Sequence, residues 1–392
     1  MFFFAFELLI LFTSIFQSYA GILSKKVDGK QYRTVWANEL DEPLVKIINQ
    51  TKLPFSFEIE NLFEVNDVIN AIKEMHVRGA GCIGVTAAYG MWLAVRESGQ
   101  DFSKYRALAD RLLASRPTAK NLSWAVERQL KLVSENQFED WASLTLKEAE
   151  LISDEDATWC KQIGEHGKKI LYDIGKHKKK GSPVNILTHC NAGWLAFADW
   201  GSATSPIYTA NREGLPIHVW VDETRPLNQG SRLTSWELAN EGVPHTIIPD
   251  NTGGHLMSSG LVDVVITGTD RTTSYGDVAN KIGTYLKALA AKDNDIPFYV
   301  ALPSSTFDWD AEEGGHDIPI EQRDPKEVMF IEGITEEGNL ESVAPSLLSA
   351  KYANYAFDIT PSRLITGLIT ERGICTADRD GIMDRFPERR IK

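Results

Sequence analysis

The chain has 392 residues, enough for one large domain or two, and its 43% hydrophobic and 24% charged composition is typical of a soluble globular protein. Its net charge of −13 argues against a broad surface for nucleic acid or an anionic membrane, but it leaves room for a local basic pocket that binds a small phosphorylated ligand. The four cysteines contain no CxxC pair, so we expect neither a zinc site nor a disulfide framework, and this usage suits a reducing compartment.

Residues 1–30 are set apart by an apolar run, MFFFAFELLILFTSIFQSYAG, that ends in a Ser-Tyr-Ala sequence resembling a signal-peptide cleavage site. The run lacks a basic start, contains Glu7, and is too interrupted for a membrane span. It is either an export signal or an upstream extension on a cytoplasmic protein. Nothing after Lys25 resembles a secreted protein, so we favour the extension and a cytoplasmic location.

Residues 31–150 are expected to form an N-terminal domain with a small sheet and several helices. Short β-like runs at 32–36, 44–48 and 55–59 predict the sheet. Residues 64–76 have the spacing of an amphipathic helix, and 82–96 form a second, apolar one. Residues 119–178 are charged and helical, and we place a domain boundary loosely near residue 150.

Two loops of this first half are candidate anion sites. Arg78-Gly79-Ala80-Gly81 breaks the chain just before a helix, where free backbone N–H groups can face a phosphate, although a plain helix–helix turn also explains the break. Arg116 stands just before another helix, in the sequence Ser-Arg-Pro-Thr-Ala.

Residues 151–392 are expected to form a Rossmann-like catalytic domain, because strands and helices alternate from residue 184 onward. Such alternation is typical of an α/β protein with a parallel, doubly wound sheet. No GxGxxG follows any of these strands, which argues against an NAD-dependent oxidoreductase. The predicted strands are 184–188, 217–221, 245–248, 262–267 and 298–301, with a further one at 355–359.

Polar residues follow four of these strands and should gather at one edge of the sheet, where ligands bind in such folds. Cys190 follows the first strand, and we expect a helix to begin directly after it, a position that lowers a thiol pKa. Asp270 follows the fourth. We expect Asp277 to cap the next helix, with Asn280 and Lys281 in its first turn facing an anion.

Four blocks of the sequence resemble the signature blocks of the 5-methylthioribose-1-phosphate isomerases. This family shares a superfamily with the regulatory alpha, beta and delta subunits of the translation initiation factor 2B exchange factor. The resemblance covers roughly residues 32–370 in the order of the family. The blocks are RGAGCIGVTAAYG, THCNAG, DETRPLNQGSRLTSWEL and GTDRTTSYGDVANKIGTY.

The resemblance implies an aldose–ketose isomerase of methionine salvage that is usually a homodimer. Its sugar-phosphate substrate is isomerised without a metal or an organic cofactor. Cys190 and Asp270 correspond to the catalytic pair of the family. The implied substrate-binding residues are Arg78, Gly79, Ala80, Arg116, Gln229, Asn280 and Lys281.

Several alternatives remain open at this point. Gly81 and Cys82 stand where the family usually has Pro-Ala, which puts the substituent at C5 of the sugar in doubt rather than the reaction. The enzyme could therefore act on 5-deoxyribose 1-phosphate or on both sugars. Ribose 1,5-bisphosphate fits less well, because the sequence offers no second cluster of cations. A non-catalytic regulatory subunit that binds a sugar phosphate or nucleotide is the competing class.

Overall fold

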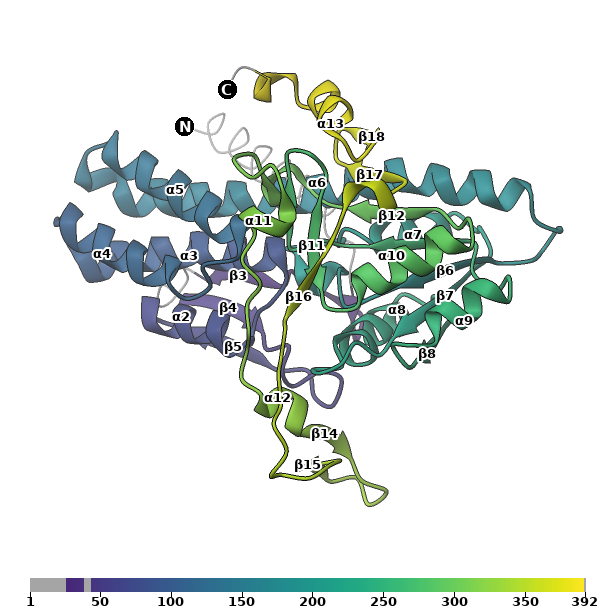
Figure 1. The fold of residues 1–392 in the computed structure, drawn as a ribbon. Coiled ribbons are helices and arrows are strands. Elements are labelled where there is room, and N and C mark those ends of the chain that lie inside the picture. Colours follow the sequence, from purple (N-terminus) through teal and green to yellow (C-terminus); the bar gives the residue numbers. More distant parts are fainter. Residues whose placement is uncertain (1–25, 39–43, 391–392) are drawn as a thin grey trace, which may run out of the picture.

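The computed structural model describes residues 26–38 and 44–390, so most of the predicted apolar extension at 1–30 lies outside the described residues. Figure 1 shows the helical lobe formed by residues 65–134 (α2–α5), the α/β body that contains β6–β8 (within residues 184–248) and β12 (Phe298–Ala301), and a hairpin arm that projects from them. Within the described ranges, no helix is both long and apolar enough to cross a membrane.

The first lobe begins with the predicted small sheet, an antiparallel β3-β4-β5 arrangement preceded by the β1–β2 pair. Only the middle strand has the predicted bounds. The strands expected at 32–36 and 55–59 form instead at 35–38 and 59–62, where the backbone pairs with the middle strand. The strands are β1 (Lys26–Val27), β2 (Lys30–Gln31), β3 (Val35–Asn38), β4 (Leu44–Ile48) and β5 (Ile59–Leu62).

Helices of the first lobe pack around α3, which is buried on nearly every side because its residues are small or apolar. The long helix α6 packs against α3 and also against α7 of the α/β body. Residue 150, where we expected a boundary, lies inside α6, so we propose that this one helix links the two domains. The helices are α2 (Val65–Lys73), α3 (Ala80–Ser98), α4 (Phe102–Leu113), α5 (Lys120–Ser134) and α6 (Trp141–Lys176).

The α/β body contains the predicted parallel sheet, with seven strands in the order β18-β17-β12-β9-β6-β7-β8. All neighbouring pairs are parallel except β17 and β18. The Rossmann-like α/β fold is therefore confirmed. The strands are β6 (Val184–Thr188), β7 (Ile217–Asp222), β8 (His245–Ile248), β9 (Val264–Thr267), β12 (Phe298–Ala301), β17 (Gly367–Thr370) and β18 (Gly373–Cys375).

Helices cover both faces of this sheet, because consecutive strand residues point to opposite sides. Ile186 and Val264 belong to a core with residues of α6–α8, whereas Leu187 and Val265 belong to another with residues of α9 and α10. The shorter helices are α7 (Ser205–Arg212), α8 (Ser235–Asn240), α9 (Gly253–Ser258), α10 (Thr284–Asp293) and α13 (Arg379–Arg385).

A second sheet, β13-β10-β11-β16, corrects two predictions. The strand expected at 355–359 forms here, antiparallel to β11, rather than in the parallel sheet. Asp277 does not cap a helix: its side chain accepts hydrogen bonds from the N–H groups of Gly314 and Ser362. The strands are β10 (Arg271–Thr273), β11 (Val278–Lys281), β13 (Phe307–Asp308) and β16 (Phe357–Thr360).

Asn280 and Lys281 therefore end a strand rather than begin a helix. Their backbones pair with Asp358 and Phe357 of β16, and α10 begins only at Thr284. Pairing with two neighbouring strands outweighs the helical spacing that the sequence suggested.

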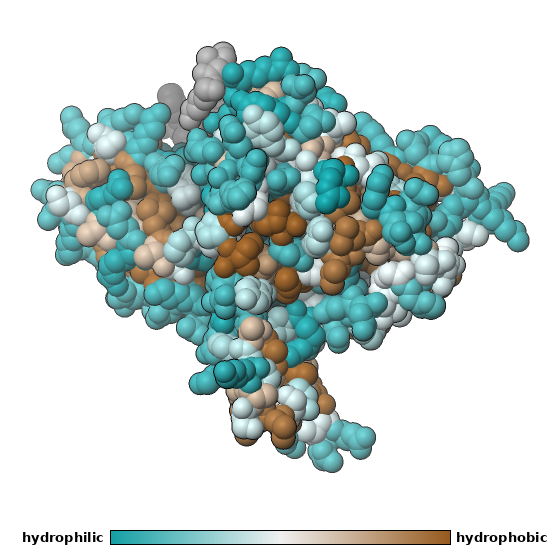
Figure 2. Space-filling model, viewed as in Figure 1, coloured by the Kyte–Doolittle hydropathy of each residue, from teal (hydrophilic) through white to brown (hydrophobic). Residues whose placement is uncertain are grey.

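The arm carries α12 (Lys326–Met329) and a hairpin of β14 (Ile331–Ile334) and β15 (Leu340–Val343), and it follows α11 (Gly314–Asp317) along the chain. Figure 2 shows apolar side chains on this projecting part of the molecule. Leu340 and Leu347, for example, are both exposed. The segment 318–331 leads from the body into the arm and passes beside the site described next.

Candidate active site

The polar residues that follow the strands meet at one edge of the parallel sheet, as predicted. Strands β6, β7 and β9 are neighbours, so the residues after Thr188, Asp222 and Thr267 are brought close together. Cys190 and Asp270 line the same small cavity there. The predicted residues Arg78, Gly79, Ala80 and Asn280 line this cavity too.

Cys190 is held on three sides at the end of β6. Its backbone N–H donates to Thr224 Oγ1 at 2.8 Å, and its carbonyl accepts from Thr234 Oγ1 at 2.7 Å. The Sγ atom donates to Gln229 Oε1 at 3.3 Å. Cys190 has a φ of 64°, so its backbone is left-handed, and only 8% of the residue is exposed.

The electrostatic setting of Cys190 differs from the prediction. The next α-helix of the described chain, α7, begins only at Ser205, so the helix that we expected directly after Cys190 does not form there. Burial raises the pKa of the Cys190 thiol, and the positive charges of Arg78 and Lys281 oppose that rise. The thiol is therefore the favoured form of Cys190.

Asp270 lies between two small cavities. Its backbone N–H donates to the Ala279 carbonyl at 3.0 Å, which fixes the turn between β9 and β10. One cavity is shared with Cys190, and the other is lined by Arg116 and by apolar residues such as Ile83 and Phe357. A carboxyl group thus stands between a thiol on one side and a buried cation on the other.

Arg116 is 9% exposed, and its Nη1 atom has no hydrogen-bond partner among the described residues. Burial lowers the pKa of Arg116, while the charges of Asp270 and Glu321 raise it. An unpartnered donor on a buried cation costs free energy unless an acceptor is supplied. Arg116 is therefore suited to bind an anion.

Lys281 is a second buried cation at this edge, with 7% of the residue exposed. Its ammonium lies over the ring of Phe357, with Nζ 5.2 Å from the centroid. Burial lowers the pKa of Lys281, and the nearby Cys190 and Asp270 act in the opposite direction. The adjacent Asn280 is fixed by a hydrogen bond of 2.9 Å from Nδ2 to Thr284 Oγ1.

Arg78 orients the Cys190 loop. Its Nη1 donates to Asn191 Oδ1 at 2.5 Å and its Nη2 to the Asn191 carbonyl at 2.7 Å. The next residue, Gly79, precedes α3 with a φ of 88°, and a Cβ atom there would overlap Ala196. The break before α3 therefore brings Arg78 and the helix start against the loop that carries the thiol.

Glu237 also fixes the loop that carries Cys190. The sequence analysis did not predict this residue. Its fully buried carboxylate accepts hydrogen bonds from Asn191 Nδ2 at 2.9 Å and from Tyr208 Oη at 2.6 Å. It also accepts from the backbone N–H groups of Trp194 and Leu195. Only the position of Glu237 in a signature block hinted at this role, because its hydrogen bonds depend on tertiary contacts.

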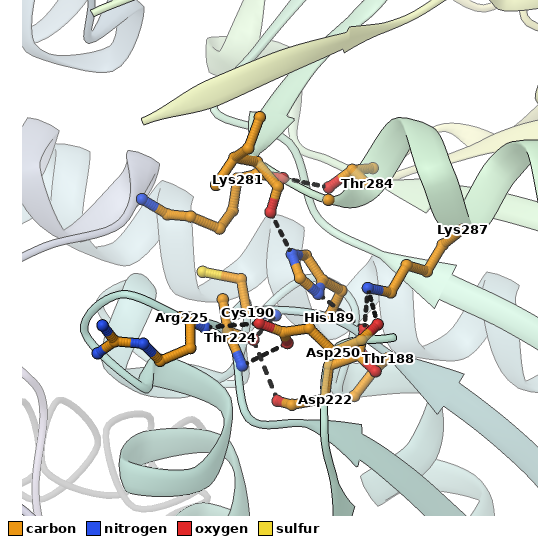
Figure 3. Close-up of polar contacts among 12 residues, drawn as sticks. Thr188, His189, Cys190, Asp222, Thr224, Arg225, Asp250, Lys281, Thr284 and Lys287 are labelled. Atoms are coloured by element: carbon orange, nitrogen blue, oxygen red, sulfur yellow. Dashed lines mark hydrogen bonds and ion pairs between the residues drawn. The ribbon is translucent and has the colours of Figure 1, made fainter. Parts of the chain in front are cut away.

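A buried polar network lies beside the cavity, around His189 (Figure 3). His189 Nδ1 is 2.8 Å from Asp222 Oδ2, and Nε2 is 2.9 Å from the Ile282 carbonyl. Both ring nitrogens thus lie within hydrogen-bonding distance of an oxygen atom, which fixes the orientation of the ring. His189 therefore joins the end of β6, which leads to Cys190, to the segment that follows Lys281.

Three residues of the same network, His189, Asp222 and Asp250, lie close enough together to bind a metal ion. Their potential ligand atoms are all within 4.8 Å of one another. Lys287 already supplies a positive charge there, because its Nζ lies 3.0 Å from Asp222 Oδ2 and 2.5 Å from the Asp250 carbonyl. Asp250 also accepts from the backbone N–H groups of Thr224 and Arg225. The group therefore fits a structural role better than a metal ion.

Comparisons with known proteins agree with this geometry. Residues 76–377 match the Initiation factor 2 subunit family. A methylthioribose-1-phosphate isomerase of Methylorubrum extorquens is 54% identical over 365 residues, which cover 93% of this chain and 99% of that protein.

Two solved structures resemble the fold over almost its whole length. The 5-methylthioribose 1-phosphate isomerase from Pyrococcus horikoshii OT3 has a TM-score of 0.77 and 36% identity, covering 92% of this chain and 97% of that one. A structure described as translation initiation factor eIF-2B, subunit delta, from A. fulgidus has a TM-score of 0.73 and 37% identity, covering 91% and 99%. The fold is therefore shared by proteins named as enzymes and by one named as an initiation-factor subunit.

Proposed function

The chain belongs to the methylthioribose-1-phosphate isomerases, and from this membership we propose that Cys190 and Asp270 carry out the reaction in the cavity that they share. The enzyme converts 5-methylthioribose 1-phosphate to 5-methylthioribulose 1-phosphate, an aldose–ketose isomerisation of methionine salvage. The observation that supports the roles best is the position of a thiol and a carboxyl group on one cavity, beside Arg78, Gly79, Ala80 and Asn280.

The chemistry of the substrate sets the requirements. Phosphate blocks the C1 oxygen, so the sugar ring must be opened by an acid that protonates the ring oxygen. A hydrogen then moves from C2 to C1. Asp270, which lines the cavity after the end of β9, is the acid in this proposal, and its carboxylate then accepts the proton that the C2 hydroxyl loses as the ketone forms.

Cys190 has one of two roles in the hydrogen transfer. In the proton route its thiolate removes the C2 proton and the resulting thiol returns a proton to C1. In the hydride route the hydrogen moves with its electron pair, and Cys190 stabilises the transition state. The buried thiol and its bond to Gln229 Oε1 are compatible with the second role, whereas the first requires that the thiolate forms when substrate is bound.

The phosphate is held by buried cations near Asp270 and by backbone N–H groups. Arg116 offers the unpartnered Nη1 atom, and Lys281 offers a buried ammonium. The N–H groups at the start of α3, next to Gly79, add neutral donors. Arg78 contributes positive charge, although two of its nitrogens are already bonded to Asn191.

The C5 substituent faces a larger cavity of about 310 Å³ next to Arg78 and Gln229. Its apolar lining includes Met75, Leu227, Leu233 and Phe330, which suits a methylthio group. A hydrophobic site discriminates by only about 1–3 kcal/mol per methylene-sized difference. For this reason 5-deoxyribose 1-phosphate is proposed as an alternative or second substrate.

A regulatory role without catalysis is the second candidate, and the likeness to the A. fulgidus protein favours it. The convergence of Cys190 and Asp270 on one cavity opposes it, because a binding subunit has no need of that pair. We also propose that the protein is cytoplasmic, since its substrate is a phosphorylated metabolite. We further propose that it is a homodimer, as its resemblance to the family implies. Light scattering of the purified protein tests the oligomeric state.

The deciding experiment compares kcat/KM for the methylthio, 5-deoxy and 5-phosphorylated sugar 1-phosphates on one enzyme preparation. We expect turnover of the methylthio sugar, with the deoxy sugar within roughly 10–200-fold of it. Turnover of the bisphosphate alone would contradict the placement of the C5 substituent against the apolar part of the lining of the cavity of about 310 Å³. Binding of a sugar phosphate without any turnover would favour the regulatory role.

A further inference from the structure

The segment 318–331 forms a wall of the site that none of the predicted residues belongs to. Arg323 of this segment lines the cavity of about 310 Å³ together with Arg78 and Gln229. It also lines a neighbouring cavity of about 370 Å³ together with Arg116. Arg323 therefore lies between two of the proposed substrate-binding arginines.

The guanidinium of Arg323 is held firmly on one side and weakly on the other. Its Nε and Nη2 atoms donate to Glu327 Oε1 at 3.0 and 2.7 Å, whereas Nη1 has a longer bond of 3.2 Å to Glu321 Oε1. Asn354 strengthens the firm side, because its Nδ2 donates to Glu327 Oε2 at 2.8 Å and its carbonyl accepts from the Arg323 N–H. The Nη1 atom, at the weakly held edge, is thus the one that can most easily exchange its present acceptor, Glu321, for another acceptor.

Two buried atoms near this edge have no hydrogen-bond partner among the described residues. One is Nη1 of Arg116 and the other is Oε2 of Glu321. Both residues line the cavity of about 370 Å³. Buried polar atoms are rarely left unpaired in native proteins, so Arg116 Nη1 is a donor suited to an anion, whereas the Glu321 carboxylate repels one.

The cations here are close enough to influence one another. Burial is the main cause of the lowered pKa of Lys281, and the positive charges of Arg116 and Arg323 lower this pKa further. Repulsion among these cations is relieved when a dianion enters between them. Arg78 contributes fewer bonds to such an anion, because Asn191 occupies its Nη1 and Nη2 atoms.

We propose that Arg323 is a further substrate-binding residue, which presents its Nη1 edge to the phosphate while Glu327 keeps the rest of the guanidinium in place. Glu321 is the counter-ion of the Arg323 Nη1 atom, and the substrate phosphate replaces it when it binds. This assignment rests on the proposed function and adds a residue from the arm-bearing segment to the phosphate site.

The test measures KM, kcat and the inhibition constant of inorganic phosphate for Arg323→Gln. Loss of a charge-assisted bond predicts a rise of about 10- to 100-fold in KM and a parallel rise in the phosphate inhibition constant. Arg128→Gln is the matched control, because Arg128 is also held by two glutamates, Glu148 and Glu155, but lies on α5 among the helices of the first lobe. The control should keep both constants within twofold of the wild-type values.

A second variant distinguishes an effect on phosphate binding from a folding defect, because it is expected to tighten binding. Glu321→Gln removes the competing charge but keeps an acceptor for Arg323, so phosphate should inhibit about two- to fivefold more tightly, by relief of the repulsion between like charges. Unchanged KM and phosphate inhibition in Arg323→Gln, or weaker phosphate inhibition in Glu321→Gln, would overturn the proposal. The wild-type enzyme is assayed alongside, so its failure to turn over the methylthio sugar would count against the proposed function instead.

Discussion

The Cys190 thiol donates a hydrogen bond to the side-chain oxygen of Gln229, with 3.3 Å between Sγ and Oε1. Gln229 follows β7 and Cys190 follows β6, so this bond joins the ends of two neighbouring strands across the site. It also places the proton on sulfur, which agrees with the raised pKa of the buried thiol. Cys190 is therefore held as a thiol, and its thiolate forms only at elevated pH or when substrate alters the site.

The first prediction concerns the pH dependence of Cys190 alkylation by iodoacetamide. Because burial raises the Cys190 pKa, the rate should reach half its maximum above the pH of about 8.5 that is typical of an exposed thiol. Lys281→Met should move the midpoint to still higher pH, since the Lys281 charge opposes the rise. The rate is followed by mass spectrometry of the peptide that contains Cys190.

The other cysteines provide the internal comparison for this measurement. Burial raises the pKa of Cys82 and of Cys375 to about 12, so neither should be modified in the same pH range. A midpoint for Cys190 below pH 8 would contradict the thiol assignment.

Gly79→Ala should destabilise the protein and disturb the Cys190 loop. Gly79 has a φ of 88°, and a new Cβ would overlap Ala196. Together, backbone strain and overlap should lower the free energy of unfolding by about 3 kcal/mol or more. Gly214→Ala is the control, because Gly214 has the same φ but nothing within 4 Å of the added Cβ, and it should cost only about 1 kcal/mol. Equal losses in urea unfolding would show that the contact with Ala196 is unimportant.

Much of this site follows from the sequence, because strand ends in a parallel sheet are forced to one edge. The positions of Cys190 and Asp270 after β6 and β9 were predictable for this reason, and so was the break before α3 at Gly79. The helix expected from Asp277 was wrong, since residues 278–281 find strand partners in β10 and β16 that local spacing does not reveal.

Other features depend on contacts between residues far apart in the chain. Glu237 holds the Cys190 loop through partners that lie 29 to 46 residues away. Arg323 follows no strand and begins no helix, so no local pattern marks it as part of the site. Residues 119–178 were expected to be helical, but local spacing does not show that Trp141–Lys176 is one continuous helix that packs against both lobes.

Asp156 should make stability depend on pH. It is buried beneath the Cys190 loop, where its Oδ2 accepts from the Ala198 N–H at 2.6 Å, and burial raises its pKa to about 7. A raised carboxyl pKa stabilises the fold below the unfolded pKa of about 3.9, and this contribution is lost as the pH rises toward 7. The loss should amount to on the order of 3 kcal/mol between pH 4 and pH 8.

Asp156→Asn keeps an acceptor for Ala198 and removes the titration, so its free energy of unfolding should vary less between pH 5 and pH 8 than that of the wild type. Asp154→Asn, two residues along α6 and paired with Arg33 near the surface, is the control and should retain the wild-type pH dependence. If the wild type and Asp156→Asn lost stability in parallel over this range, Asp156 would not be the titrating group.

The catalytic assignment of Cys190 and Asp270 is tested most directly by single-turnover and steady-state kinetics of Cys190→Ser and Asp270→Asn with 5-methylthioribose 1-phosphate. Both variants keep the size and hydrogen-bonding shape of the side chain, so substrate binding should stay within a fewfold of the wild type. Turnover should fall by about 10²–10⁴-fold, as expected when a group acts on the reacting atoms. Near-normal kcat in either variant, or a loss confined to KM, would contradict the proposed pair.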